Sequence, residues 1–215
     1  KSDGAATDIK KAANFLWNRE AKRAMEEFIK DVKPDVVHLH NIYHHLSTSI
    51  LAPIKRANIP CVQTLHDLKL ACPNYRMYTE GALCERCKGG RYFEAVKHRC
   101  LWDGFVPNML AAAEMGFTKA KQSYERTVKT FICPSDFIAN KMIEWGEPAS
   151  KFTVVRSPVP QMAARATRSG GYLLAVGRLS HEKGYESLLQ AAKSVPEMPI
   201  KIAGRGPDED RLKSY

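Results

Sequence analysis

The chain has 215 residues, of which 44% are hydrophobic, and its 33 lysines and arginines outnumber 23 acidic residues for a formal net charge of +10. This apolar content excludes a disordered chain and suits one large domain or two small ones. No run approaches the roughly 18 uninterrupted apolar residues of a membrane span. The first residues, KSDGAATDIKK, contain no apolar signal core. The surplus of basic residues is compatible with nucleic acid, anionic lipid or phosphorylated substrates as binding partners, and it does not distinguish among the three.

Apolar periodicity predicts that helices and strands alternate along residues 10–155. Expected helices cover 10–32, 46–57, 106–129 and 136–145, and expected strands cover 35–40, 61–65, 130–133 and 152–155. Pro34 should end the first helix, and Gly116 should interrupt the third. Ser135 is a candidate N-cap of the fourth helix, and Gly146 a candidate stop.

The pattern breaks at residues 156–171, where two prolines, arginines and a glycine pair indicate a linker. It resumes with a strand at 172–176, a helix at 185–195, a strand at 199–203 and a helix near Pro207. Alternating strands and helices predict parallel pairing, so we expect two doubly wound, Rossmann-like α/β domains. The expected domains are residues 1–158 and 172–215, joined by a linker at 159–171. Both should be incomplete, because the chain begins inside one predicted helix and stops soon after another begins.

Polar or glycine residues follow five of the predicted strands. They are His40-Asn41, His66-Asp67, Pro134-Ser135, Gly177-Arg178 and Gly204-Arg205-Gly206. Open parallel sheets bind ligands beyond the carboxyl ends of their strands, so these residues predict a cleft. The alternative is that strands simply end in turns, which favour the same residue types.

Arg178 and Lys183 stand between a predicted strand and the next helix. Gly177 permits a tight turn, and the helix that follows offers free backbone N–H groups. A guanidinium fork beside a lysine point charge suits a diphosphate. Alternatively, both cations are solvated and pair with Glu182 or Glu186.

A second glycine turn, GRGP at 204–207, follows the last predicted strand. It resembles half of a dinucleotide-binding fingerprint, although the third glycine is absent. A dinucleotide-dependent epimerase is therefore a weaker alternative.

Residues 68–105 do not fit the alternation, and they contain four cysteines. Cys72, Cys84, Cys87 and Cys100 have the spacing C-x11-C-x2-C-x12-C. This spacing suits a structural zinc site, in which His98 could replace one cysteine. Two disulfides, an iron–sulfur cluster and four free thiols are the alternatives. Lys88, Arg91 and Lys97 would offset the charge of such a site, and Cys61 and Cys133 read as small core residues.

Four histidines lie within eight residues, at positions 38, 40, 44 and 45. His38 and His40 share one strand face, and the group has no supporting carboxylate. We expect His40 to line the cleft and the others to have core or surface roles.

Several segments resemble one family. VGRLSHEKGYESLLQAA and IAGRGPDEDRL are similar to the opening of the C-terminal domain of family-4 retaining glycosyltransferases of GT-B fold. KPDVVHLHN, TLHD, FICPSDF and FTVVRSPV follow the order of that family's N-terminal domain. The chain therefore resembles a bacterial member with a cysteine-rich insert, and the resemblance implies a fragment that lacks both ends.

The resemblance implies a hexosyl-type glycosyltransferase that moves a sugar from a nucleotide-diphosphate donor to an acceptor hydroxyl with retention. Arg178 and Lys183 would bind the diphosphate and stabilise the leaving group without a required metal. His66 would lie beside the donor sugar. The remaining implied contacts are the nucleotide pocket at Gly177, Gly204 and Gly206, and the acceptor side at Asn41 and Ser135. The family's first glycine-rich loop and its paired glutamates do not occur in these residues, so the isolated chain is expected to be inactive.

The implied partners are a nucleotide-sugar donor and a glycan or lipid-linked acceptor, with no nucleic acid. The implied place is the cytoplasm, including peripheral contact with the anionic inner face of the cell membrane. A run of basic residues could make that contact or form a solvated helix face: Lys10, Lys11, Arg19, Lys22, Arg23 and Lys30. The alternative from another class is a basic, zinc-containing nucleic-acid-binding protein, which the scattered basic residues disfavour.

Overall fold

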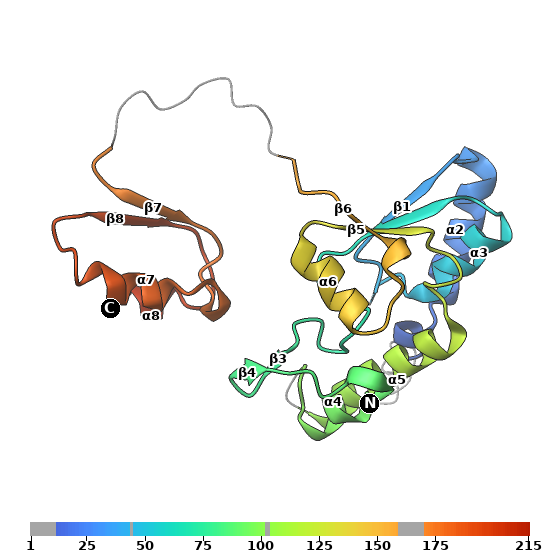
Figure 1. Ribbon diagram of the computed structural model, residues 1–215, viewed down its shortest axis with the longest axis horizontal. Coiled ribbons are helices and arrows are strands. Elements are labelled where there is room, and N and C mark those ends of the chain that lie inside the picture. The colour runs from blue at the N-terminus through green and yellow to red at the C-terminus, as the bar shows by residue number, and fades with distance from the viewer. Residues whose placement is uncertain (1–11, 44, 102–103, 159–169) are drawn as a thin grey trace, which may run out of the picture. The chain divides into compact units, whose positions relative to one another are not determined.

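The computed structural model describes residues 12–43, 45–101, 104–158 and 170–215 (Figure 1). The chain divides into two compact units, Lys1–Pro158 and Val159–Tyr215. Residues 159–169 of the expected linker, together with Lys10, Lys11 and His44, lie outside the described residues. None of the described helices is long and apolar enough to cross a lipid bilayer.

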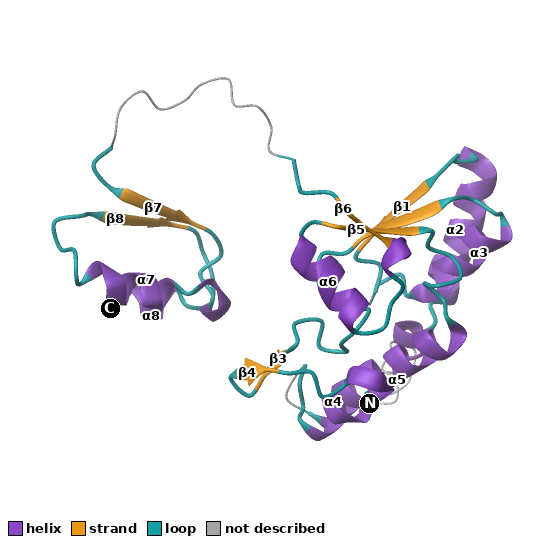
Figure 2. Ribbon diagram, in the orientation of Figure 1, coloured by secondary structure: helices purple, strands orange, loops and turns teal. Residues whose placement is uncertain are grey.

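The first unit is built on a sheet of four parallel strands in the order β1-β2-β5-β6 (Figure 2). The strands are β1 (Val37–His40), β2 (Cys61–Thr64), β5 (Thr130–Cys133) and β6 (Phe152–Val154). Each pair is joined by a chain segment that contains helix, so the carboxyl ends of all four strands meet at one edge. The predicted parallel α/β class is confirmed.

The helix expected over residues 10–32 is broken. Residues 12–16 are helical, and α2 (Arg19–Val32) begins afresh after Asn18. The Asn18 side-chain oxygen accepts a hydrogen bond from the Ala21 amide at 3.0 Å, which makes Asn18 an N-cap. Its own amide donates to Ser47 Oγ at 2.9 Å, so the break joins the chain to a later loop. Lys33, with φ of 48°, ends α2 just before Pro34.

The other helices of this unit follow the predictions with one exception. A 3-10 turn (Thr48–Ile50) leads into α3 (Leu51–Arg56), and α6 (Asp136–Glu144) has Ser135 as its N-cap. The exception is α5 (Phe105–Lys121), which runs through Gly116 without interruption and ends at Lys121, eight residues before the predicted end at 129. One glycine costs a helix only about 1 kcal/mol, which the buried contacts of α5 outweigh.

The cysteine-containing insert has its own small elements. A hairpin joins β3 (Tyr78–Thr79) to β4 (Ala82–Leu83), a 3-10 turn covers Lys88–Gly90, and α4 (Phe93–Lys97) packs against α5. Within the insert, residues 102 and 103 are not among those described.

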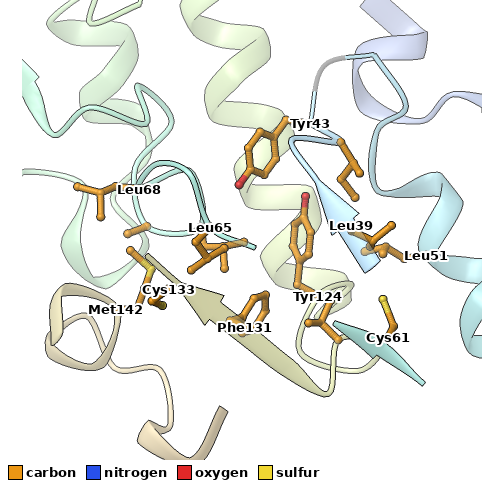
Figure 3. Close-up of a cluster of buried hydrophobic side chains, with 14 of the residues drawn as sticks. Leu39, Tyr43, Leu51, Cys61, Leu65, Leu68, Tyr124, Phe131, Cys133 and Met142 are labelled. Atoms are coloured by element: carbon orange, nitrogen blue, oxygen red, sulfur yellow. The ribbon is translucent and has the colours of Figure 1, made fainter. Parts of the chain in front are cut away.

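The core of the first unit lies between the sheet and its helices (Figure 3). Leu65, Phe131 and Met142 are at most 1% exposed. Cys61 and Cys133 are fully buried among them, and burial raises the pKa of each thiol to about 11. These two cysteines are therefore packing residues that stay protonated.

The second unit contains a parallel strand pair and two helices. These are β7 (Leu173–Val176), β8 (Ile200–Ala203), α7 (Tyr185–Ala192) and α8 (Glu209–Lys213), with a 3-10 turn at His181–Lys183. Pro207 was expected near the start of the last helix, which begins two residues later. The Asp208 amide instead donates to the Leu179 carbonyl at 3.0 Å, so residues 207–208 form a turn.

The turns that follow β7 and β8 are in direct backbone contact. A Cβ on Gly204 would lie 1.8 Å from the carbonyl oxygen of Gly177, and one on Gly206 would lie 2.1 Å from that of Leu179. The Leu179 amide also donates to the Arg205 carbonyl at 2.9 Å. Glycine is thus required at positions 204 and 206, because the two backbones lie too close together to leave room for a Cβ.

Replacing Gly204 with alanine should separate these turns, because its Cβ would overlap a carbonyl oxygen. We expect β7 and β8 amides to lose at least about tenfold in hydrogen-exchange protection, with the first unit unchanged. Gly116→Ala is the matched control, since a Cβ there meets nothing within 4 Å. Normal protection of β7 and β8 in Gly204→Ala would show that the contact is unimportant.

Candidate active site

Three histidines gather at the carboxyl ends of β1 and β2. His40 Nδ1 lies 2.8 Å from His66 Nε2, so one of the two nitrogens donates its proton to the other. The rings of His38 and His40 lie 4.2 Å apart, and His38 Nε2 is 2.8 Å from Thr64 Oγ1. The parallel register places His40 opposite Thr64, which brings His66 within reach two residues later. The structure therefore joins His40 and His66, which the sequence predicted for one cleft.

The pKa of His40 lies below the usual histidine value, which favours its neutral ring. Partial burial lowers its pKa, and the nearby charges that His38 and His66 can carry lower it further. A neutral imidazole paired with a second imidazole can pass a proton or hold a hydroxyl group in place. The pair suits the binding of a polar, uncharged group such as a sugar hydroxyl.

A buried ion pair lies behind the loop that carries His66. Lys69 Nζ is 2.7 Å from Glu114 Oε2, with only 3% and 5% of the two side chains exposed. The groups are in charge contact although their angle is poor for a hydrogen bond. Thr118 Oγ1 donates to the other Glu114 oxygen at 3.3 Å. Because Glu114 belongs to α5, this pair fixes the loop after β2 to that helix.

Asp67 adds a second attachment of the same loop. Its carboxylate accepts a hydrogen bond from the Lys69 amide at 2.9 Å, and the nearby Tyr43 hydroxyl helps to lower its pKa. Burial nevertheless raises the pKa of Asp67. Figure 3 shows the hydroxyls of Tyr43 and Tyr124 turned toward the same interior region. His66 is thus an exposed side chain on a loop held from below by buried polar contacts.

This support was missed in the sequence, although a signal existed. Lys69 interrupts the apolar run LKLAC, and Glu114 interrupts the run LAAAEMG. A lone charge of each sign inside an apolar segment indicates two buried partners. Spacing alone could not pair them, because they are far apart in the chain.

The acceptor-side candidates are placed less tightly. Asn41 has φ of 43° and an exposed side chain directly after β1. Ser135 Oγ accepts from the Ile138 amide at 3.4 Å, so this hydroxyl is occupied as a helix cap. Both lie at the same sheet edge as the histidines, but in the described part of the chain no hydrogen bond joins either one to His40 or His66.

In the second unit, Arg178 and Lys183 flank one turn after β7. Arg178 donates to Glu182 Oε1 at 2.6 Å, and Ser180 Oγ donates to the same oxygen at 2.8 Å. Hydrogen bonds from Ser180, from its own backbone and from Arg178 lower the pKa of Glu182 to about 2. The pairing alternative thus holds for Arg178. Glu186 pairs with Arg211 instead, and the Lys183 ammonium contacts no acidic group among the described residues.

The four cysteines of the insert line one small cavity. The Cys87 thiol donates to the Cys72 sulfur, which lowers the pKa of Cys72 to about 7 and raises that of Cys87. All four are free thiols, and no three histidine, cysteine or acidic side chains in the described part of the chain already surround a single metal position. His98 is directed elsewhere, with Nδ1 at 2.9 Å from Glu80.

The Lys69–Glu114 pair should show strong coupling in a double-mutant cycle. Lys69→Met alone leaves a buried carboxylate and Glu114→Leu alone leaves a buried ammonium, so each should lower the free energy of unfolding by about 3–5 kcal/mol. The combined Lys69→Met, Glu114→Leu variant should recover most of that loss. Additive losses in denaturant titrations would contradict the pairing.

The pKa of His40 should be visible by NMR. The pKa of His40 is lower in the folded protein than in the unfolded chain. His40 therefore has no effect on the free energy of unfolding above the unfolded pKa, and it lowers that free energy as the pH drops below this value and through the folded pKa. We expect a His40 midpoint below 6.5, and His38→Asn should raise it by removing one nearby charge. A midpoint at or above the unfolded value would contradict the arrangement.

Comparison with known proteins concerns mainly the first unit. The model of Glycosyltransferase Family 4 matches residues 5–161. An uncharacterised 42.6 kDa protein in the cps region of Klebsiella pneumoniae is 23% identical over 181 residues, which is 83% of this chain and 42% of that protein. The chain therefore spans about two fifths of the length of that relative.

A UDP-N-acetylglucosamine 2-epimerase from Rickettsia bellii matches with a TM-score of 0.41 and 15% identity, over 91% of this chain and 46% of that one. The family match covers most of the chain, and it agrees with the parallel sheet and with the GT-B class expected from the sequence. The chain belongs to glycosyltransferase family 4.

Proposed function

We propose that this chain forms part of an enzyme that transfers a hexosyl group from a nucleotide-diphosphate donor to a glycan or lipid-linked acceptor, with retention. Family membership supports glycosyl transfer in general. The matched relative from a cps region supports a polysaccharide acceptor. The donor contacts belong to the second unit and the acceptor contacts to the first.

The observation that best supports this proposal is the backbone contact between the turns after β7 and β8, because the first of these turns carries Arg178 and Lys183. Gly204 and Gly206 allow the two turns to lie in backbone contact, and a Cβ on Gly177 would lie 2.8 Å from the Tyr185 hydroxyl, so the base of the site is closely packed. Arg178 is already ordered by Glu182, and the exposed Lys183 ammonium is available for a ligand. A diphosphate could bridge the two cations and take the place of the Glu182 carboxylate on Arg178.

Atoms and charge are conserved in the proposed transfer of the sugar from the donor to the acceptor. The acceptor hydroxyl oxygen bonds to the anomeric carbon while the bond from that carbon to the diphosphate oxygen breaks. The hydroxyl proton passes to the leaving phosphate oxygen, on the same face of the sugar. Arg178 and Lys183 stabilise the charge that develops on the diphosphate, which is electrostatic catalysis.

His66 is assigned a binding role rather than that of a general base. Its ring is hydrogen-bonded to the neutral His40, and the loop beneath is fixed by Lys69 and Glu114. Such a pair can orient a hydroxyl of the donor sugar or of the acceptor. Asn41 and Ser135 are the remaining polar groups proposed for the acceptor side.

Contact with the anionic surface of the inner membrane is part of this proposal. Arg19 and Arg23 lie on α2 and line an open hollow with Trp17. Lys22 is paired with Glu26 at 2.6 Å, which removes it from the group available for lipid headgroups. Arginine beside tryptophan suits the interface between headgroups and acyl chains.

The function is tested by assaying the full-length protein with a panel of nucleotide-diphosphate sugars. Arg178→Ala and Lys183→Ala should each lower kcat/KM by about 10²–10³-fold, because each removes stabilisation of the leaving group. NMR of the product should show the donor's anomeric configuration.

Lys193→Ala is the matched control, because its ammonium lies over the Tyr215 ring at 4.6 Å and away from the turns after β7 and β8. It should keep normal activity. Absence of transfer from every donor in the panel, or full activity in both cation variants, would overturn the proposal.

A further inference from the structure

We infer that Cys72, Cys84, Cys87 and Cys100 together bind one Zn²⁺ ion, which anchors the insert. This inference does not depend on the proposed function. It rests on where the four sulfurs lie, on the hydrogen bonds they accept, on the backbone around them and on the size of the space they enclose.

The four side chains converge from three separate parts of the insert. Cys72 lies in the loop after β2, Cys84 and Cys87 come after the β3–β4 hairpin, and Cys100 follows α4. All four line one cavity, and Cys72 and Cys87 are already in hydrogen-bond contact. Among the described residues, no extended sheet joins the hairpin to α4. What these segments have in common is the cysteine side chains that converge beside them.

The Cys72 sulfur is surrounded by donors suited to a thiolate. The backbone amides of Asn74 and Met77 donate to it in addition to the Cys87 thiol. The Thr79 side chain hydrogen-bonds to Cys100. Amide donors to sulfur are the outer contacts that stabilise and orient thiolate ligands in metal sites. Ordinary buried thiols such as Cys61 gain no comparable set.

The backbone beside the cysteines is strained. Tyr75, Met77, Glu80 and Arg99 have φ of 52°, 50°, 53° and 45°, in the left-handed region that residues with a Cβ rarely adopt. Gly89 and Gly90, directly after Cys87, have φ of 73° and 84°. Such conformations persist only where surrounding contacts enforce them. A bond network that ties the cysteine-bearing segments together would provide that constraint.

The enclosed space favours a single ion over a cluster. The free volume among the four cysteines is about 10 Å³, close to one water-sized sphere. A four-iron cluster with its sulfides would need the insert to open, whereas one Zn²⁺ needs the sulfurs to draw in to about 2.3 Å from it. The thiols do not yet surround one point, so side-chain rotation accompanies binding and four protons leave.

Nearby cations offset the charge of four thiolates on one dication. Lys69 acts on Cys72, and Arg86 acts on both Cys84 and Cys100. The sequence predicted this role for Lys88, Arg91 and Lys97, and the structure adds Lys69 and Arg86. Lys69 also pairs with Glu114, so the metal site adjoins the support of the His66 loop.

The test is elemental analysis of the full chain purified without chelator, with thiols counted in parallel. We expect about one equivalent of zinc, and four thiols shielded from a thiol reagent until the metal is removed. Cys84→Ser with Cys87→Ser should lower the zinc content to less than about a tenth of an equivalent. Cys61→Ala is the matched control and should keep the metal, because Cys61 lies in the sheet core.

Titration of the metal-free chain with Co²⁺ keeps the test decisive if the double variant fails to fold. A tetrahedral tetrathiolate site should give intense visible absorption that one equivalent of Zn²⁺ abolishes. Less than half an equivalent of zinc, stoichiometric iron in its place, two disulfides by thiol count, or weak Co²⁺ absorption of an octahedral site would each overturn the inference.

Discussion

The buried ion pair between Lys69 and Glu114 connects the parts of the first unit that carry chemistry. It joins the loop after β2 to α5, and that loop has His66 on one side and Cys72 on the other. Two charges taken out of water are stable only while they remain together, so the loop cannot leave the helix without a large loss of free energy. The polar interior thus gives the exposed histidine pair a fixed position that hydrophobic packing alone would not specify.

The two units achieve rigidity by different means. In the first, side chains from several elements meet beneath the sheet edge, as Asp67 and Tyr43 do. In the second, the backbones themselves touch through Gly204 and Gly206, and few side chains are buried. Arg178 is therefore positioned mainly by the path of the chain and by its partner Glu182.

Much of the fold was predictable because apolar runs and turn residues alternate clearly. Thr130–Cys133 forms a strand with the expected bounds, and Ser135 caps the next helix as its residue type indicates. The break at Asn18 was not predictable, because its cause is a hydrogen bond to Ser47 from a distant loop. Likewise, the apolar runs predicted two strands that are each followed closely by a histidine. The contact between His40 and His66 depends on the register of β1 against β2, which the sequence alone does not determine.

The closeness of the two turns in the second unit limits where this unit can vary. Carbonyl oxygens occupy the space where side chains of residues 204 and 206 would begin, so these two positions are closed to variation by size. Exposed positions beside them in the chain or on the facing turn, such as Arg205 and His181, carry no such restriction. Under the proposed function, variation in sugar or base selectivity, in nature or in the laboratory, would arise at such exposed positions while the two glycines stay constant.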